Sequence, residues 1–252
     1  MHHICGLLLD GKLHLAPIGS NPQRILDVGT GTGIWAIDIA ECYPSAQVIG
    51  TDLSPIQPTW VPPNVKFQID DAEAEWTWER DSFDYIHIRH LAGAIKDWPA
   101  LLKQAYKFLK PGGYIEVHEY HMGLFSDDGS YDKHTAIWKF YALIGEAAKK
   151  NATSIEPLLE GAGFHHIHVK MVKAPMGTWA AEPKQKERGA YLQMASESGF
   201  EAIGIALLTR DGEMTAVEAR VLMDSARADL RNKKIHSYSK HYFGYGQKPL
   251  TD

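Results

Sequence analysis

The sequence is poor in the features that mark secreted, membrane-spanning and nucleic-acid-binding proteins. It has two cysteines, Cys5 and Cys42, without metal-binding spacing, which fits a reducing cytosolic or nuclear compartment. No apolar run approaches the roughly 20 residues of a membrane-spanning helix. The apolar stretch at residues 4–9 lacks the basic flank and the cleavage site of a signal peptide. A net charge of −5 gives no electrostatic reason to expect nucleic acid or an anionic membrane as a partner.

The length and composition suit one large globular domain. The chain has 252 residues, of which 44% are hydrophobic and 23% are charged, which is ordinary for a protein with a buried core. No internal repeat and no low-complexity segment interrupts it. We therefore expect a single domain over residues 1–252.

Short apolar runs alternate with helical patterns in the first half of the chain. The helical patterns cover 34–42, which Pro44 ends, and 98–109. The apolar runs read as buried strands at 24–28, 47–51, 65–69, 83–88 and 114–118. This alternation predicts a doubly wound parallel sheet whose right-handed crossovers bury both faces.

The second half is less regular and predicts mainly helices. We expect helices at 135–150, 155–162, 182–208 and 215–231, a strand at 164–172 and an antiparallel strand at 236–245. The expected core therefore covers about 20–120 and 230–250, and the expected helical cap covers about 121–230.

A glycine motif follows the first strand. Asp27 begins it, and Gly29, Gly31 and Gly33 lie at alternate positions. Glycines here let a ligand approach the backbone at the carboxyl end of the first strand, where open α/β sheets bind ligands. Ile34 stands where the last glycine of a dinucleotide fingerprint belongs, which disfavours NAD.

Residues 25–33 resemble motif I of class I S-adenosylmethionine (SAM)-dependent methyltransferases. The likeness continues at Asp52 and at the 109–113 turn. It implies a Rossmann-like, mostly parallel seven-stranded sheet with a C-terminal antiparallel strand and a helical cap insertion, and it implies SAM as cofactor and S-adenosylhomocysteine (SAH) as product. By this resemblance the cofactor-binding residues are Asp27, Gly29, Thr30, Gly31, Gly33, Asp52, Leu53, Asp71, Ala72 and Arg89.

Each assignment has a physical reason or an alternative. Asp52 would accept hydrogen bonds from the two ribose hydroxyls. Asp71 and Ala72 would lie beside adenine, with Asp70 as the alternative to Asp71. Asp27 matches a position near the amino acid end of SAM, but its carboxylate could instead anchor the glycine turn through backbone N–H groups.

The likeness narrows to the fungal LaeA-like group of secondary-metabolism methyltransferases at 11–18, 64–73, 86–89, 175–179 and 246–249. It implies a biosynthetic methyltransferase in the cytoplasm. One alternative is a LaeA-like regulator, nuclear and acting with protein partners. Another is a SAM-binding protein that catalyses cyclisation without methyl transfer. Members of this group usually carry a further N-terminal stretch, so we expect a homodimer or a partner chain to cover the SAM site here.

Three residues after the fifth strand are candidates for proton transfer to or from the acceptor. His118 is the first candidate base, because a histidine pKa lies near neutrality, and Glu119 and His121 are the alternates. The competing interpretation is a solvated polar loop. The tract at 165–168 holds three histidines without a nearby carboxylate, so no metal site is expected.

Aromatic and methionine residues in the cap predict a roomy apolar pocket and hence a small lipophilic or aromatic acceptor. They are Trp138, Phe140, Tyr141, Met176, Trp179, Tyr191 and Met194. Tryptophans at 60, 76, 78 and 98 could wall the adenine, although such residues more often belong to a core or a lid.

Overall fold

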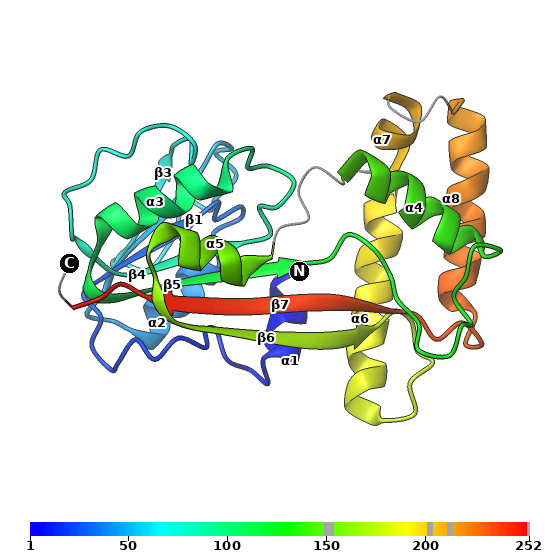
Figure 1. The fold of residues 1–252 in the computed structure, drawn as a ribbon, viewed down its shortest axis with the longest axis horizontal. Coiled ribbons are helices and arrows are strands. Elements are labelled where there is room, and N and C mark those ends of the chain that lie inside the picture. Colours follow the sequence, from blue (N-terminus) through cyan, green and yellow to red (C-terminus); the bar gives the residue numbers. More distant parts are fainter. Residues whose placement is uncertain (149–153, 201–203, 211–213, 251–252) are drawn as a thin grey trace.

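The computed structural model describes residues 1–148, 154–200, 204–210 and 214–250, and its centre is a seven-stranded sheet (Figure 1). The strand order is β3-β2-β1-β4-β5-β7-β6. Neighbours from β3 to β5 are parallel, and β7 runs antiparallel to both β5 and β6. The expected fold class is therefore confirmed. The strands are β1 (Arg24–Val28), β2 (Gln47–Asp52), β3 (Val65–Ile69), β4 (Phe83–Arg89), β5 (Leu109–Tyr120), β6 (His165–Pro175) and β7 (Tyr238–Gln247).

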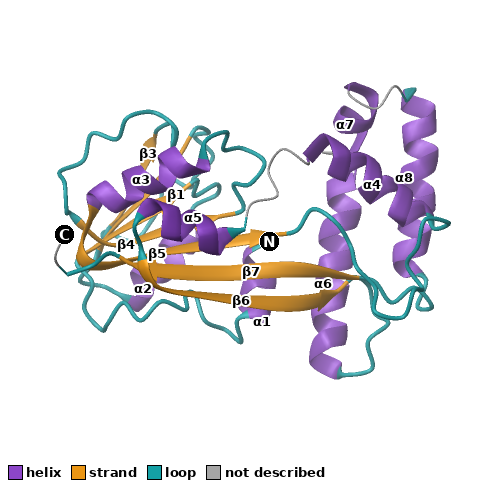
Figure 2. Ribbon diagram, in the orientation of Figure 1, coloured by secondary structure: helices purple, strands orange, loops and turns teal. Residues whose placement is uncertain are grey.

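Helices cover both faces of the sheet (Figure 2). On one face, α3 (Trp98–Phe108) and α5 (Ile155–Ala162) pack into a common core with β1, β4 and β5. On the other face, α2 (Ile34–Cys42) packs against β1, β2 and β4, and α1 (His2–Leu8) packs towards β7. The two layers leave the carboxyl ends of the parallel strands as the edge at which a ligand can bind.

Local signals explain where α3 begins and which face it buries. The Asp97 side chain accepts a hydrogen bond from the backbone N–H of Ala100 and so caps the helix. Leu101, Ala105 and Phe108 then recur at helical spacing, and all three are buried against the sheet.

The cap stands beyond the carboxyl ends of the parallel strands (Figure 1). Its helices are α4 (Ala136–Ala148), α6 (Pro183–Gly199), α7 (Ile205–Arg210) and α8 (Ala216–Arg231). Helix α5 and strand β6 lie within the expected cap range of 121–230 but pack with the sheet. The cap is therefore built from two separate chain segments. The range expected as one helix at 182–208 holds α6 and α7, and its residues 201–203 lie outside the described residues.

Strand β5 is longer than the sequence pattern suggested. The turn expected at 109–113 lies inside it, as an irregularity in the pairing with β4. Phe83 pairs with Leu109, whereas Tyr85 pairs with Tyr114, so β5 carries extra residues between two paired positions. A β-bulge of this kind bends a strand without ending it, and β5 continues to Tyr120 beside β7.

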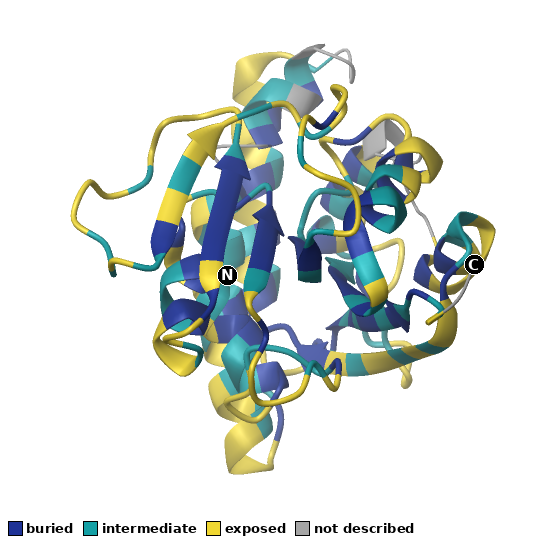
Figure 3. Cartoon of the chain, turned by 90° about the vertical axis from the view of Figure 1, so that its left-hand side faces the viewer, coloured by how far each residue is buried: buried dark blue, intermediate teal, exposed yellow. Residues whose placement is uncertain are grey.

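Burial is greatest in the central strands, as Figure 3 shows. Every residue of β1 after Arg24 is buried, as are residues 85–88 of β4. Within the described residues, no helix has the length and apolar character needed to cross a membrane.

Candidate functional site

The glycine turn after β1 has the backbone shape that its sequence predicts. Gly31 has a φ of 58°, in the left-handed region that favours glycine. A Cβ added to Gly31 would meet no atom within 4 Å, whereas one added to Gly29 would lie 2.5 Å from the Leu91 side chain. The backbone at Gly31 therefore faces open space, and a ligand can approach it closely.

Asp52 connects the end of β2 to this turn. Its Oδ2 accepts a hydrogen bond from the N–H of Gly31 at 2.8 Å, and its Oδ1 accepts one from Ser54 at 2.9 Å. Each carboxylate oxygen has two lone pairs, so both oxygens can accept a further hydrogen bond. This arrangement fits an acceptor for two adjacent hydroxyl groups.

An apolar surface lies next to that carboxylate. Leu53 is 68% exposed and Ile69 is 67% exposed, and Ile69 is the register partner of Asp52. Large apolar side chains so exposed at a sheet edge suit a flat aromatic ligand such as adenine. Ile69 was not among the expected cofactor residues. Its place as the last residue of β3, next to Asp70, could have drawn attention to it.

The choice between Asp70 and Asp71 stays open. Asp70 accepts a hydrogen bond from the N–H of Asp71, and Asp71 accepts one from the N–H of Glu73. Ala72 packs against the core beside Trp76, whose indole N–H donates to the Ala72 carbonyl. Both carboxylates border the same turn, so their contacts with adenine stay predictions.

Asp27 is held inside the protein instead of at its surface. It is 3% exposed, and its Oδ2 accepts a hydrogen bond from the Thr30 hydroxyl at 2.6 Å. Its Oδ1 lies 2.7 Å from Nδ1 of His87. The contact with Thr30 links Asp27 to the glycine turn through a side-chain hydroxyl, whereas both the anchoring role through backbone N–H groups and the direct contact with SAM stay predictions.

Helix α1 lies across the carboxyl ends of the strands and contacts Arg89. The His2 ring bridges two groups, with its Nε2 2.8 Å from Asp38 of α2 and its Nδ1 3.3 Å from the Arg89 guanidinium. Burial lowers the pKa of His2, Arg89 lowers it further, and Asp38 opposes both. Neither His2 nor Asp38 was predicted, because the contact joins segments far apart in the sequence.

The same helix also binds the cap. The Arg188 side chain of α6 donates to the carbonyl of Leu7 at 2.7 Å and to Asp10 at 3.1 Å. The His3 ring packs edge-on against Tyr191 of α6. Because α1 contacts both the β4 end and α6, it joins the glycine-turn side of the molecule to the cap.

The three candidate catalytic residues do not converge on one point. His118 is 1% exposed and its ring binds Glu116 and His87, whereas His121 is exposed and its ring packs on Phe125. Glu119 follows His118 on β5 and therefore faces the opposite side of the strand. His118 has no route to an acceptor in this arrangement, but all three catalytic roles stay predictions.

Glu119 has the most suggestive environment of the three. Its Oε1 accepts hydrogen bonds from the backbone N–H groups of Leu91 and Ala92, directly after β4. Burial raises its pKa to about 7, although these two hydrogen bonds oppose the shift. A carboxyl group with such a pKa can exchange a proton near neutral pH.

The aromatic and methionine residues expected to line one pocket in the cap lie in different places, some in a core and some at the surface. Phe140 and Met176 are buried in the core between α1, β7 and the cap helices, and Tyr141 and Tyr191 pack against it. Trp138 is 38% exposed and lines an apolar groove on the outer surface of the cap. Of the four tryptophans considered for adenine, Trp76 and Trp98 belong to the core and Trp60 is 92% exposed. The histidine tract at 165–168 lies on β6, and the described residues hold no metal-ligand cluster.

Comparison with known proteins identifies the fold and its chemistry. The family model described as "Methyltransferase domain" matches residues 1–169. The chain is 37% identical to methyltransferase pytC of Aspergillus terreus over 256 residues, which cover 99% of this chain and 79% of pytC. This chain belongs to the methyltransferase-domain family.

Two further likenesses place this methyltransferase among its relatives. It is 37% identical to secondary metabolism regulator LAE1 of Cochliobolus heterostrophus, over 98% of this chain and 85% of LAE1. Its fold matches Haemonchus contortus phosphoethanolamine N-methyltransferase 2, solved with SAM, with a TM-score of 0.55. That match is 21% identical over 92% of this chain and 50% of the other. The methyltransferase is thus related both to a protein named as a methyltransferase and to one named as a secondary metabolism regulator.

The residues at the edge of the sheet fit SAM, the methyl donor of this enzyme class. The open backbone face at Gly31 admits a close ligand, and the Asp52 carboxylate suits a ribose diol. Exposed apolar side chains at Leu53 and Ile69 suit adenine, and the Arg89 guanidinium suits a carboxylate. SAM is therefore assigned as the cofactor of this methyltransferase, whereas the contacts of individual residues stay predictions.

Proposed function

We propose that this methyltransferase methylates a small lipophilic or aromatic secondary metabolite. The observation that carries the proposal is the position of the cap beyond the carboxyl edge, where α1 joins it to Arg89 (Figure 1). The core shared by α1, β7 and the cap is apolar and includes Phe140, Met176 and Phe243. An acceptor between this core and the strand ends would meet mainly apolar and aromatic groups.

The chain supplies positioning and proton transfer. SAM supplies a methyl group already activated by its sulfonium leaving group. Asp52 and Arg89 would fix the donor at its ribose and its carboxylate, so that the methyl carbon faces the acceptor. Glu119 would take the acceptor proton, because its pKa of about 7 lets it be ionised at neutral pH. The cap and α1 would exclude water from the reacting atoms.

Two further polar groups at the ends of β4 and β5 can orient an acceptor, and one of them, Tyr120, faces the opposite side of β5 from Glu119. The rings of His90 and Tyr120 meet edge-on with centroids 5.2 Å apart, at the ends of β4 and β5. Burial raises the pKa of Tyr120, and Glu119 adds to the shift. Burial also keeps the pKa of His90 well below its ordinary value. Both groups are therefore neutral at pH 7 and suit a neutral aromatic acceptor.

An acceptor screen tests this proposal. The enzyme and SAM are incubated with deproteinised metabolite fractions and with phenolic and indole compounds, and SAH formation is measured. The proposal predicts an acceptor-dependent rate that Glu119→Gln lowers by about 10²- to 10⁴-fold. SAH affinity should be retained in that variant. No acceptor-dependent SAH across the screen, or an unchanged rate in Glu119→Gln, would refute it.

The likeness to LAE1, named a secondary metabolism regulator, and to laeA of Emericella nidulans, named a protein-methionine methyltransferase, supports a second candidate, a regulator that methylates protein. Methyl-labelled SAM separates the two candidates in an extract divided into protein and small-molecule fractions. Label in the small-molecule fraction supports the biosynthetic function, and label confined to protein supports the regulatory one. Both cysteines are free thiols, which suits a reducing compartment and therefore fits either candidate, cytoplasmic or nuclear.

A further inference from the structure

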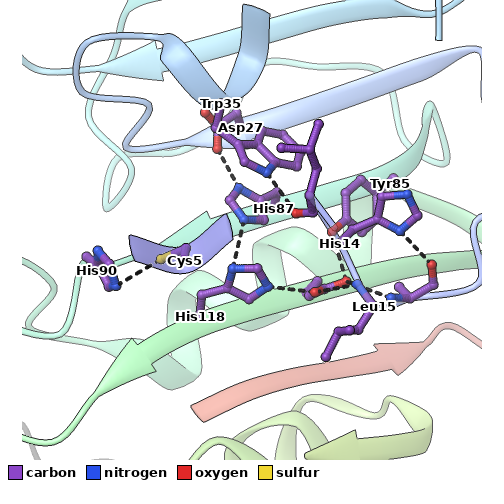
Figure 4. Close-up of polar contacts among 12 residues, drawn as sticks. Cys5, His14, Leu15, Asp27, Trp35, Tyr85, His87, His90 and His118 are labelled. Carbon is purple, nitrogen blue, oxygen red and sulfur yellow. Dashed lines mark hydrogen bonds and ion pairs between the residues drawn. The ribbon is translucent and has the colours of Figure 1, made fainter. Parts of the chain in front are cut away.

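Four buried side chains form a continuous polar chain beneath the glycine turn (Figure 4). Nε2 of His118 lies 2.6 Å from Oε1 of Glu116, and Nδ1 of His118 lies 3.5 Å from Nε2 of His87. Nδ1 of His87 lies 2.7 Å from Oδ1 of Asp27. The chain thus runs from β5 through β4 to β1, and we call these four residues the buried chain.

The buried chain is closed off from water. The exposed fractions of Glu116, His87, His118 and Asp27 are 0%, 0%, 1% and 3%. The Trp35 ring stacks on His87 with centroids 3.7 Å apart, and a ring edge contact joins Phe243 to His118. In such an environment each nitrogen and oxygen must find its hydrogen-bond partner inside the protein.

One end of the buried chain is a fixed anion. Glu116 accepts hydrogen bonds from the backbone N–H groups of Leu15 and Ala16 and from the Tyr85 hydroxyl. Burial alone would raise the pKa of Glu116, but the hydrogen bond from His118 and the other donors lower it to about 2. Because Glu116 is ionised, Nε2 of His118 must carry a hydrogen.

Together, the three contacts of the buried chain require one hydrogen more than two neutral imidazoles can supply. The contacts Glu116–His118, His118–His87 and His87–Asp27 each need one hydrogen, whereas two neutral imidazoles carry one each. The extra proton can make His118 an imidazolium while Asp27 is ionised. It can equally lie on Asp27 while both imidazoles are neutral. Small proton shifts within the contacts convert one arrangement into the other.

The far end of the buried chain holds the glycine turn. Oδ2 of Asp27 accepts the Thr30 hydroxyl at 2.6 Å, and the N–H of Thr30 donates to the carbonyl of Thr51 at the end of β2. Thr30 stands between Gly29 and Gly31 in the glycine turn. The position of the turn therefore depends on how Asp27 is held.

We propose that His87, His118 and Glu116 are positioning residues for SAM, which share one buried proton with Asp27 and thereby hold the glycine turn in its ligand-binding shape. Without that proton, the lone pairs of His87 Nε2 and His118 Nδ1 would face each other. One ring would then have to turn, and Asp27 and Thr30 would move with it. The inference rests on the cofactor assignment and does not depend on which acceptor is methylated.

Other titratable groups surround the buried chain. Arg89 and Tyr85 face it from β4, His90 from the loop after β4, His2 from α1 and His14 from the segment before β1. Burial and Glu116 hold the pKa of Tyr85 well above its ordinary value, so Tyr85 does not change charge near neutrality. Burial and Arg89 lower the pKa of His2, so the wild type and its variants are compared at the same pH values.

The sign of the pH effect follows from burial. Burial raises the pKa of Asp27 to about 6 and holds the pKa of His87 well below its ordinary value. The folded protein therefore binds the extra proton more strongly than a free carboxyl group does, and the proton is lost as pH rises through about 6. SAH affinity should fall above that pH, by at most about tenfold per pH unit for one linked proton.

Calorimetric titration with SAH between about pH 5 and about pH 8 tests the proposal. Asp27→Asn supplies the third hydrogen from its amide, which can donate to Nδ1 of His87, so no extra proton is needed and its SAH affinity should vary less with pH than that of the wild type. The matched control is His241→Gln, on the neighbouring strand β7. Burial lowers the pKa of His241 to about 4, so it stays neutral and its loss should leave the profile unchanged. An Asp27→Asn profile as steep as that of the wild type would overturn the proposal.

A measurement on the wild type keeps the test decisive if Asp27→Asn does not fold. Titrations above pH 7 in two buffers of different ionisation enthalpy give the number of protons taken up when SAH binds. The proposal predicts an uptake approaching about one proton. Histidine side-chain nitrogen spectra should also show an imidazole in hydrogen-bond contact with a second one. An uptake near zero would overturn the proposal.

Discussion

Replacing Asp52 with alanine should weaken SAH binding chiefly through the ribose. The carboxylate accepts hydrogen bonds from Gly31 and Ser54 and retains lone pairs for two hydroxyls. Leaving those hydroxyls unpaired should cost about 1–3 kcal/mol, which corresponds to a loss of roughly 5- to 150-fold in affinity. Calorimetric titration of wild type and Asp52→Ala with SAH measures that loss directly.

A ligand lacking the ribose hydroxyls separates a direct contact from damage to the turn. If Asp52 binds the ribose, the substitution should matter much less for a dideoxyribose analogue of SAH than for SAH. Glu41→Ala, at an exposed position in the last turn of α2, serves as a control for the loss of a surface carboxylate. Equal losses for both ligands, or no loss at all, would refute the ribose contact.

The other predictions concern pH, catalysis, the cap and assembly. Burial raises the pKa of Glu119 to about 7. The protonated Glu119 therefore favours the folded protein at low pH, and this contribution to the free energy of unfolding should be lost as the pH rises from the ordinary pKa of a glutamate through about 7. Denaturant titrations should show a weaker pH dependence in Glu119→Gln. If His118 is instead the base, His118→Ala should lower turnover by about 10²- to 10⁴-fold while SAH affinity stays unchanged, whereas the positioning role predicts that affinity falls as well. Thr215→Ala removes one half of the capping box with Glu218 and should lower stability by about 0.5–2 kcal/mol, and an unchanged unfolding midpoint would count against it. If a partner chain covers the SAM site, SAH affinity should rise with protein concentration, whereas coverage by α1 and the cap alone predicts a constant affinity.

Sequence patterns predicted the bounds of those elements whose ends are marked by residues in the local sequence. The bounds of β1, α2, β3 and α5 agree with their apolar runs and helical spacing, because each is closed by a glycine, a proline or a polar turn. The length of β5 was not predictable in this way. Its continuation through Gly112 and Gly113 depends on pairing with β4 and β7, which the local sequence does not contain.

The sequence predicted only part of the site, again because it does not contain the pairing of the strands. The glycine turn and Asp52 belong to one motif with fixed spacing, so the sequence indicated them directly. The buried chain joins β1, β4 and β5, and its contacts exist only after those strands pair. A signal was nevertheless present, since Glu116 and His118 are polar residues two apart in an otherwise apolar strand and must face one side together. His87 is likewise a polar residue between two apolar residues of β4.

The most direct test of the account is a crystal structure of this methyltransferase with SAH. The account predicts that the adenine lies against Leu53 and Ile69, that the ribose hydroxyls donate to Asp52 and that the homocysteine end lies beside Arg89. It also predicts that Asp27 keeps its contacts with Thr30 and His87. SAH bound away from the glycine turn, or with its ribose far from Asp52, would contradict the account.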